Sequence, residues 1–363
     1  MSEPMDLGQY GWNASVADRF KRHVAEDLRP ARVLAEHRGS YALVTTTGEI
    51  DGSVSGRFRY DASSAEEFPA VGDWVGIEMG AAGAAAIIRA VLPRQTQFAR
   101  PARGDQPGAQ VVAANVDVVL VVSGLDDDFN IRRLERFMTL AWSSGAEPVI
   151  VLNKADLCED IAARLADVAA IAPGVPIRVL SARDGTGIES LTPLLEPGKT
   201  IALLGSSGVG KSTIVNALLG WERQVTKDVR EDDARGRHTT TSRELMVMPS
   251  GALLIDNPGI RSVGVWDADE GLDDAFADVQ AFAAECRFND CTHEGEPGCA
   301  VRAAIESGQL PAERLASQQH LTREWAALAR RVDPNARANE RARWKAIHRS
   351  VRNHMKQKYE AEA

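Results

Sequence analysis

Short apolar and β-branched runs, each ended by glycine or another turn residue, characterise the first third of the chain. These runs cover 41–45, 52–56, 72–78 and 85–91. Closely spaced strands with glycine at the corners are typical of a small closed sheet. The pattern therefore predicts an OB-type β-barrel over residues 32–100, preceded by an irregular or partly helical N-terminal extension, residues 1–31.

From residue 101 onward, apolar runs alternate with segments of helical periodicity. Strands are expected at 116–122, 148–152, 177–180 and 201–204, with helices at 130–142 and 159–171. Such alternation is the signature of a parallel sheet with crossover helices. It predicts a central α/β domain over 101–275, in which 245–248 and 252–255 form a hairpin.

The C-terminal region, residues 276–363, is predicted to be helical at 300–307, 311–332 and 336–358. The whole chain carries a net charge of −9, yet residues 311–363 hold 12 Lys and Arg against 6 Asp and Glu. The last helix combines an apolar stripe with many basic residues, which fits either an RNA contact or a packed helix with a solvated face. We favour RNA, because an otherwise acidic chain keeps a basic patch here.

A glycine-rich stretch after strand 201–204 matches the phosphate-loop pattern G-x-x-x-x-G-K-[ST]. Its glycines let successive backbone N–H groups and the following helix N-terminus face phosphate oxygens. Lys211 would reach the β- and γ-phosphates, and Ser212 would place its hydroxyl on Mg²⁺. The predicted nucleotide-binding residues here are Gly205, Ser206, Ser207, Gly208, Val209, Gly210, Lys211, Ser212 and Thr213.

Two other strand ends carry a possible base reader, Asn153-Lys154-Ala155-Asp156 and Ser181-Ala182. The Asp156 carboxylate can accept two hydrogen bonds from guanine, whereas adenine has no matching donors, so Asp156 would select the base. Asn153 would contact the other edge of the base and brace the loop. The Lys154 stem would lie over the ring, and the Ala182 N–H would face guanine O6.

Residues 222–243 are polar and charged without a hydrophobic period, which predicts a mobile loop. Thr240 is our choice among its three consecutive threonines for a further Mg²⁺ ligand. Asp256 would hold Mg²⁺ through water, and the Gly259 N–H would sense the γ-phosphate. The magnesium site would thus comprise Ser212, Thr240 and Asp256.

These motifs occur in an unusual order, because the base-reading motif precedes the phosphate loop. Joining the old ends of a domain and cutting it elsewhere preserves its core, so the order indicates a circularly permuted GTPase. In this arrangement, the segment from Asp256 to Gly259 leads directly toward the C-terminal region and could transmit the nucleotide state there.

Three of the four cysteines cluster with a histidine near the C-terminus as Cys286, Cys291, His293 and Cys299, spaced C-x₄-C-x-H-x₅-C. Three thiolates and one imidazole complete a closed structural Zn²⁺ site. Disulfides or unrelated core cysteines are the alternatives, and the ligand types favour zinc.

No apolar run approaches the roughly 18 residues of a membrane span, and no signal peptide is evident, so we expect a cytoplasmic protein.

The sequence resembles the circularly permuted, small-ribosomal-subunit-dependent GTPases of the RsgA or YjeQ family. The resemblance runs from about 32 to 310 and includes FPAVGDWV, NKAD, GSSGVGKS, RGRHTTT and CRFNDCTHEGEPGCAV. It implies a barrel, a permuted GTPase and a zinc domain that work in late maturation of the small subunit. Its implied partners are GTP/GDP and the small subunit with its 16S rRNA, and we expect a monomer. Asn257 departs from the family's D-T-P-G pattern, with little expected effect.

The position that holds a water-orienting glutamine in Ras-like enzymes is Ile260 here, which has no hydrogen-bonding side chain. His238, beside the loop threonines, can orient a water or accept a proton near neutral pH. The resemblance strengthens this catalytic assignment, since His238 matches the family residue proposed for the task. A loop histidine without a role is the alternative.

Two other functions are compatible with parts of the pattern. A non-hydrolysing RNA-binding adaptor would use GTP only as a structural ligand, and a phosphate-loop ATP enzyme such as a kinase would lack a guanine reader.

On the barrel, Arg57, Arg59 and Tyr60 are the best candidates for an RNA-stacking face, although a solvated strand end explains them equally well.

Overall fold

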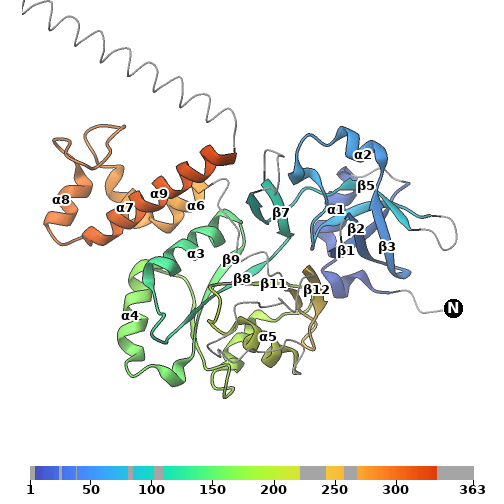
Figure 1. The fold of residues 1–363 in the computed structure, drawn as a ribbon, viewed down its shortest axis with the longest axis horizontal. Helices are drawn as coiled ribbons and strands as arrows, with labels where there is room; N and C mark the ends of the chain where they lie inside the picture. Colours follow the sequence, from blue (N-terminus) through green and yellow to red (C-terminus); the bar gives the residue numbers. More distant parts are fainter. Residues whose placement is uncertain are drawn as a thin grey trace, which may run out of the picture.

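The computed structural model describes residues 5–23, 27–37, 39–80, 85–101, 109–220, 243–256 and 268–332. They fall into an N-terminal barrel (blue in Figure 1), a central sheet flanked by helices (green to yellow) and a C-terminal group of helices (orange to red). The predicted multidomain architecture of barrel, α/β sheet and helical C-terminal region is therefore confirmed.

The barrel contains five strands: β1 (Arg29–His37), β2 (Ser40–Thr45), β3 (Gly48–Val54), β4 (Trp74–Glu78) and β5 (Ala86–Val91). They follow the order β1-β2-β3-β5-β4, and β4 pairs back onto β1, which closes the sheet. Inward-facing side chains such as Val33, Leu43, Ile77 and Ile88 are fully buried. The patterning did not predict β1, because the charged Arg32 interrupts its apolar residues.

Helices cover parts of the barrel: η1 (Leu7–Tyr10), α1 (Ala14–His23), α2 (Gly56–Asp61) and η2 (Ala65–Glu67). The expected strand at 52–56 stops at Val54, since Ser55 caps α2 by accepting from the Phe58 N–H over 3.0 Å. The description of Arg57, Arg59 and Tyr60 as a strand end is therefore wrong. They lie on α2, where Tyr60 is 90% exposed.

The central sheet has the order β10 (Ile177–Val179), β9 (Glu147–Asn153), β8 (Val118–Gly124), β11 (Thr200–Leu204), β13 (Leu253–Asp256) and β12 (Arg243–Val247). All neighbours are parallel except β12 and β13, which form the predicted hairpin. The connecting helices are η3 (Ala155–Leu157), α3 (Ile131–Ser143), α4 (Ile161–Ile171), η4 (Ile188–Leu194) and α5 (Lys211–Leu219). Because helices cover both faces, most residues of the inner strands are buried, and β11 is buried along its whole length.

The barrel and the central sheet are hydrogen-bonded to each other through a short antiparallel contact between β1 and β12. Ala35 pairs with Glu244 and Glu36 with Arg243, while Glu244 also pairs with Asp256 on β13. A separate hairpin of β6 (Gln97–Pro101) and β7 (Ala109–Ala114) spans the position where the barrel was expected to end. Because β1 pairs with β12, eleven of the thirteen strands in the described part of the chain form one continuous sheet.

Arg32 on β1 is the buried polar centre of this junction, with 2% exposure. Its guanidinium donates to the Tyr10 carbonyl, to the Gly72 carbonyl over 3.2 Å and to the Thr200 hydroxyl over 2.8 Å. Burial lowers the pKa of Arg32 to about 10, so the group stays protonated at neutral pH. The network joins the N-terminal segment, the barrel and the start of β11.

The C-terminal region comprises α6 (Ala268–Ala275), α7 (Ala277–Ala283), α8 (Ala300–Glu306) and α9 (Ala312–Val332). It packs on α3, where Arg314 of α9 contacts Glu135 over 2.6 Å, and Arg314 also contacts Asp278 of α7 over 2.6 Å. The predicted helices 300–307 and 311–332 are thus present, while 336–358 lies outside the described residues. Within the described ranges, no helix has the length and apolar character needed to cross a membrane.

Candidate functional site: a phosphate loop, a base loop and a metal centre

The glycine-rich stretch forms a tight loop between the buried strand β11 and helix α5. Gly205 has a φ of +149° and lies so close to the Val122 carbonyl that a Cβ would collide with it. Gly210, at φ +94°, leaves no room for a Cβ beside the Asn153 amide. Glycine is therefore required at both ends of the loop, which curls as a phosphate cradle must.

Lys211 begins α5 and folds its side chain back over this loop. Its ammonium donates to the Gly205 carbonyl over 2.7 Å and to the Ser206 carbonyl. The positive charge is thus held inside the loop, where phosphate oxygens would be received. Ser212 and Thr213 follow in the first turn of α5 and are half-buried, while Ser207 and Gly208 are exposed at the tip.

Asn153, at the end of β9, links the base loop to the phosphate loop. Its side-chain amide donates to the Val209 carbonyl over 2.8 Å, and its oxygen accepts from the Ala182 N–H over 2.9 Å. The side chain is 2% exposed, so both hydrogen bonds are shielded from water. Three segments that lie far apart in the sequence meet at this one residue.

The Asn153 amide and the Ala182 N–H, which were both expected to contact the base, already have hydrogen-bond partners within the protein. Because the Ala182 N–H already donates to Asn153, a bond from it to guanine O6 would have to be shared or exchanged. Asn153 acts as a brace, with both ends of its amide used within the protein. Ser181 is buried beside them and donates its N–H to the Thr186 carbonyl over 2.8 Å.

Asp156 lies in η3, and its side chain is exposed and so accessible to a ligand. Lys154, just before η3, adopts a left-handed backbone with φ +65°. Its ammonium contacts Asp126 over 2.5 Å. Asp126 was missed by the sequence reasoning, although its position just after β8, the neighbour of β9, offered a signal.

Asp256 ends β13, next to β11 in the parallel sheet, with Ala202 paired to Ile255. Because the carboxyl ends of neighbouring parallel strands meet at one edge of a sheet, Asp256 lies at the same edge as the phosphate loop and Ser212. Oxygen groups of this kind suit Mg²⁺. The other predicted residues of this part of the site, His238, Thr240 and Gly259, lie outside the described residues.

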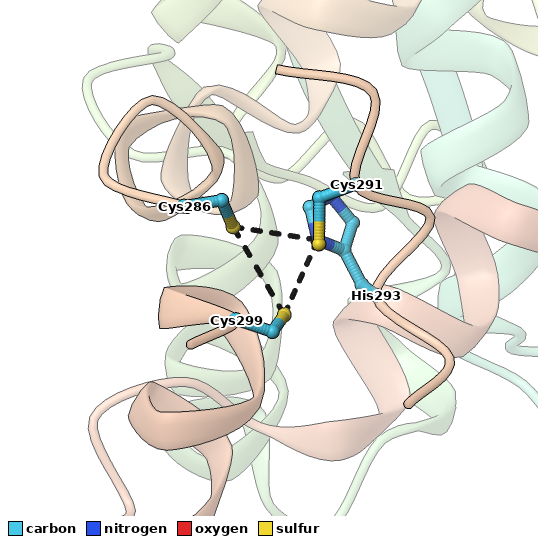
Figure 2. A group of neighbouring side chains, drawn as sticks. All are labelled: Cys286, Cys291, His293 and Cys299. Carbon is cyan, nitrogen blue, oxygen red and sulfur yellow. Dashed lines mark hydrogen bonds between the residues drawn. The ribbon is translucent and has the colours of Figure 1, made fainter. Parts of the chain in front are cut away.

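The four predicted zinc ligands converge on one point, as Figure 2 shows. Their ligand atoms all lie within 4.8 Å of one another, with His293 Nδ1 3.4 Å from Cys299 Sγ and 3.7 Å from Cys286 Sγ. A tetrahedral zinc with bonds of about 2.0–2.3 Å spaces its ligand atoms by roughly 3.5–3.8 Å. The Cys286 and Cys299 sulfurs are 4.0 Å apart and form no disulfide. This donor set fits zinc.

Glu296 organises the loop that carries His293 and was also missed by the sequence reasoning. Its carboxylate accepts from the Thr292 hydroxyl over 2.5 Å and from the backbone N–H groups of Thr292, Glu294 and Gly295 over 2.9–3.1 Å. These hydrogen bonds, that from the Thr292 hydroxyl first, hold the pKa of Glu296 well below its usual range. The loop is thus shaped by an anion next to the metal centre.

Comparison with known proteins agrees with this arrangement. A model of the RsgA GTPase family matches residues 91–266. The chain is 48% identical to the small ribosomal subunit biogenesis GTPase RsgA of Opitutus terrae, over 96% of this chain and 97% of that protein. Its identity to the protein of the same name from Streptomyces coelicolor is 44%, over 93% and 92% of the two chains.

Among solved structures, YjeQ from Thermotoga maritima is similar with a TM-score of 0.62 and 27% identity. The match covers 82% of this chain and 98% of that one. YloQ, described as a circularly permuted GTPase, shares the fold with a TM-score of 0.60 over 83% and 96% of the two chains, at 23% identity. The permuted order of motifs is therefore a property of the fold and not an accident of this sequence.

Proposed function

This chain belongs to the RsgA family of circularly permuted, GTP-hydrolysing enzymes, and from that premise we propose that it assists biogenesis of the small ribosomal subunit. The curated relatives that span nearly the whole chain carry this function in their names. GTP would bind at the phosphate loop and be hydrolysed to GDP and phosphate when the subunit is engaged. The small subunit and its 16S rRNA are the proposed partners.

The observation that carries the nucleotide assignment is the position of Asn153. It bonds to Val209 in the phosphate loop and to Ala182 after β10, although the base motif precedes the phosphate loop in the chain. A phosphate cradle braced directly by a base-reading loop supports a guanine nucleotide bound with its phosphates on one motif and its base on the other.

Each end of the nucleotide would then meet residues suited to it. Lys211 would exchange its two loop carbonyls for β- and γ-phosphate oxygens, which bear more negative charge. The exposed Asp156 carboxylate would accept hydrogen bonds from guanine and leave adenine without a partner. GTPase family membership implies Mg²⁺ with GTP, which neutralises phosphate charge, and Ser212 and Asp256 would hold it, joined by Thr240.

For hydrolysis, we assign the water-orienting role to His238. Ile260 cannot make hydrogen bonds, so an imidazole from the segment next to Thr240 is the best-suited group in the sequence. In this proposal the small subunit would position His238, and the free protein would turn over slowly. The Gly259 N–H would respond to the γ-phosphate.

Around the GTPase centre, we propose a division into 1–31, a barrel at 32–100, the GTPase at 101–275 and a zinc-binding region at 276–363. Cys286, Cys291, His293 and Cys299 would hold one structural zinc, which contributes folding free energy. The exposed helix α2 and the basic segment after residue 336 would contact rRNA. A monomer in the cytoplasm, where ribosomes are assembled, fits these partners.

Steady-state release of phosphate from GTP by the full-length protein, with and without small ribosomal subunits, tests the proposal. We expect slow release alone, marked acceleration by small subunits, and competition by GDP but not by ATP. Absence of any turnover with small subunits would favour a non-hydrolysing RNA-binding adaptor. Competition by ATP as effective as that by GDP would indicate a phosphate-loop ATP enzyme.

A further inference from the structure

Lys154 of the base-reading motif forms an ion pair with Asp126, a residue that belongs neither to that motif nor to the phosphate loop. Asp126 lies in the loop after β8, and Lys154 in the loop after the adjacent parallel strand β9. The strands are paired up to their last residues, Gly124 with Asn153, and the Leu125 N–H donates to the Asn153 carbonyl over 2.8 Å. The two loops are therefore held side by side by the backbone.

Within this frame, the two charged side chains meet in a partly shielded position. The ammonium of Lys154 is 2.5 Å from the Asp126 carboxylate, with side-chain exposures of 27% and 24%. The Asp126 carbonyl accepts from the Phe129 N–H over 2.9 Å, which closes a turn around Asp126 and fixes its backbone. An ion pair of this exposure is stronger than one between fully solvated groups.

Gly124 provides the room that the lysine needs. A Cβ at this position would lie 3.4 Å from Lys154 Cδ and 2.8 Å from an Asp126 carboxylate oxygen. The aliphatic stem of Lys154 thus runs close over the bare backbone of Gly124 and is tied at its tip by Asp126. A free lysine has four rotatable bonds, and ordering them costs side-chain entropy.

We propose that Asp126 is a positioning residue for guanine nucleotide binding, which holds the Lys154 stem in place before the base arrives. This inference rests on the proposed function, in which the stem lies over the base. Part of the entropy cost of ordering the lysine is met in the nucleotide-free protein, so the nucleotide binds a prepared surface. Asp126 itself reads no atom of the base, and base selectivity stays with Asp156.

The run of three aspartates supplies matched variants. Asp127 is exposed, and Asp128 contacts Arg133 over 2.9 Å, so only Asp126 contacts the lysine. Asp126→Asn removes the charge and keeps the size, and Asp127→Asn makes the same chemical change one residue away. We would measure GDP affinity of the full-length protein with Mg²⁺ by titration calorimetry, and confirm folding by thermal unfolding.

We expect Asp126→Asn to weaken GDP binding by about three- to tenfold and Asp127→Asn to leave it unchanged. In a Lys154→Ala background, Asp126→Asn should have no further effect, because the two residues act through one interaction. The difference between parent and Asp126→Asn should shrink as KCl is raised, because salt screens the pair. Asp126→Glu should recover part of the affinity.

Unchanged GDP affinity in Asp126→Asn would overturn the inference while leaving the proposed function intact. Tighter binding would overturn it as well, since the pair would then compete with the nucleotide for Lys154. An equal loss in the parent and Lys154→Ala backgrounds would point to a general disturbance of the loop instead. Failure of the parent itself to bind GDP would remove both the inference and the proposed function.

Discussion

Arg32 and Thr200 are joined by a hydrogen bond of 2.8 Å from the guanidinium to the hydroxyl. Arg32 belongs to the first strand of the barrel, and Thr200 is the first residue of β11, whose other end carries the phosphate loop. The Thr200 N–H in turn donates to the Asp117 carboxylate over 2.7 Å. The strand that presents the phosphate cradle is thus anchored to the barrel at its buried end.

Arg32→Met should lower the free energy of unfolding by about 3 kcal/mol, because it leaves buried carbonyls and the Thr200 hydroxyl without their donor. The midpoint of urea unfolding provides the measurement. Arg29→Met, an exposed position on the same strand, is the control and should change stability by less than about 0.5 kcal/mol. Equal midpoints for the two variants would contradict a central role for Arg32.

Asp156→Asn should weaken GDP and GTP binding and improve binding of xanthine nucleotides, because an amide reverses one hydrogen-bond direction. The loss for guanine should be on the order of 100-fold, because the variant presents an amide N–H to a donor of the base and leaves both groups without an acceptor. Competition between GDP and xanthosine diphosphate measures the switch. An unchanged preference would assign base reading to another residue.

Removal of zinc should unfold the C-terminal region and leave nucleotide binding largely intact. The purified, reduced protein is expected to contain one zinc per chain, and a strong chelator should abolish the helical signal of this region. Metal analysis and far-UV circular dichroism provide the measurements. Absence of zinc in intact, reduced protein would refute the assignment.

Within the same centre, Glu296→Gln should speed zinc loss to the chelator, since the carboxylate organises the backbone beside His293. Glu306→Gln is the matched control. Glu306 lies exposed at the end of α8 and takes part in none of the hydrogen bonds through which Glu296 organises the metal loop. Identical rates of zinc release in the two variants would argue against a role for Glu296.

His238→Ala should remove most of the acceleration by small subunits, a loss on the order of 10²-fold in turnover, if the imidazole orients the attacking water. Affinities for GTP and for the subunit should be nearly unchanged, because His238 is not proposed to bind either. Single-turnover hydrolysis at saturating subunit concentration measures the effect. Full stimulation of the variant would place the water-orienting group on the ribosome or on another residue of the protein.

The sequence alone allowed the phosphate loop, the base loop and the metal cluster to be predicted, because each is a short contiguous pattern. Lys211 and Asn153 follow from such patterns, and the structure brings their segments together. Asp126 and Glu296 were missed because their importance comes from partners that only the folded backbone identifies. A carboxylate in a polar loop looks the same in sequence whether it is solvated or holds a lysine.

Two features of the fold were hidden for a similar reason. The strand β1 contains Arg32, and a charged residue inside a strand weakens the apolar pattern, although here the charge is buried and paired. The Ser55 cap converts the expected end of a strand into α2. In both cases the pattern of hydrophobic residues gave the wrong secondary structure, because it does not show the hydrogen bond that stabilises the observed one.

The pairing of β1 with β12 has a consequence for folding while the protein is being synthesised. Residues 29–32 of β1 pair with β4, which follows soon in the chain, but Ala35 and Glu36 pair with β12. During synthesis, the end of β1 that pairs with β12 has no partner until Arg243–Val247 has been made. An unpaired strand edge can form hydrogen bonds with other chains. Completion of the GTPase sheet closes that edge, so premature termination within the GTPase leaves a barrel prone to aggregate.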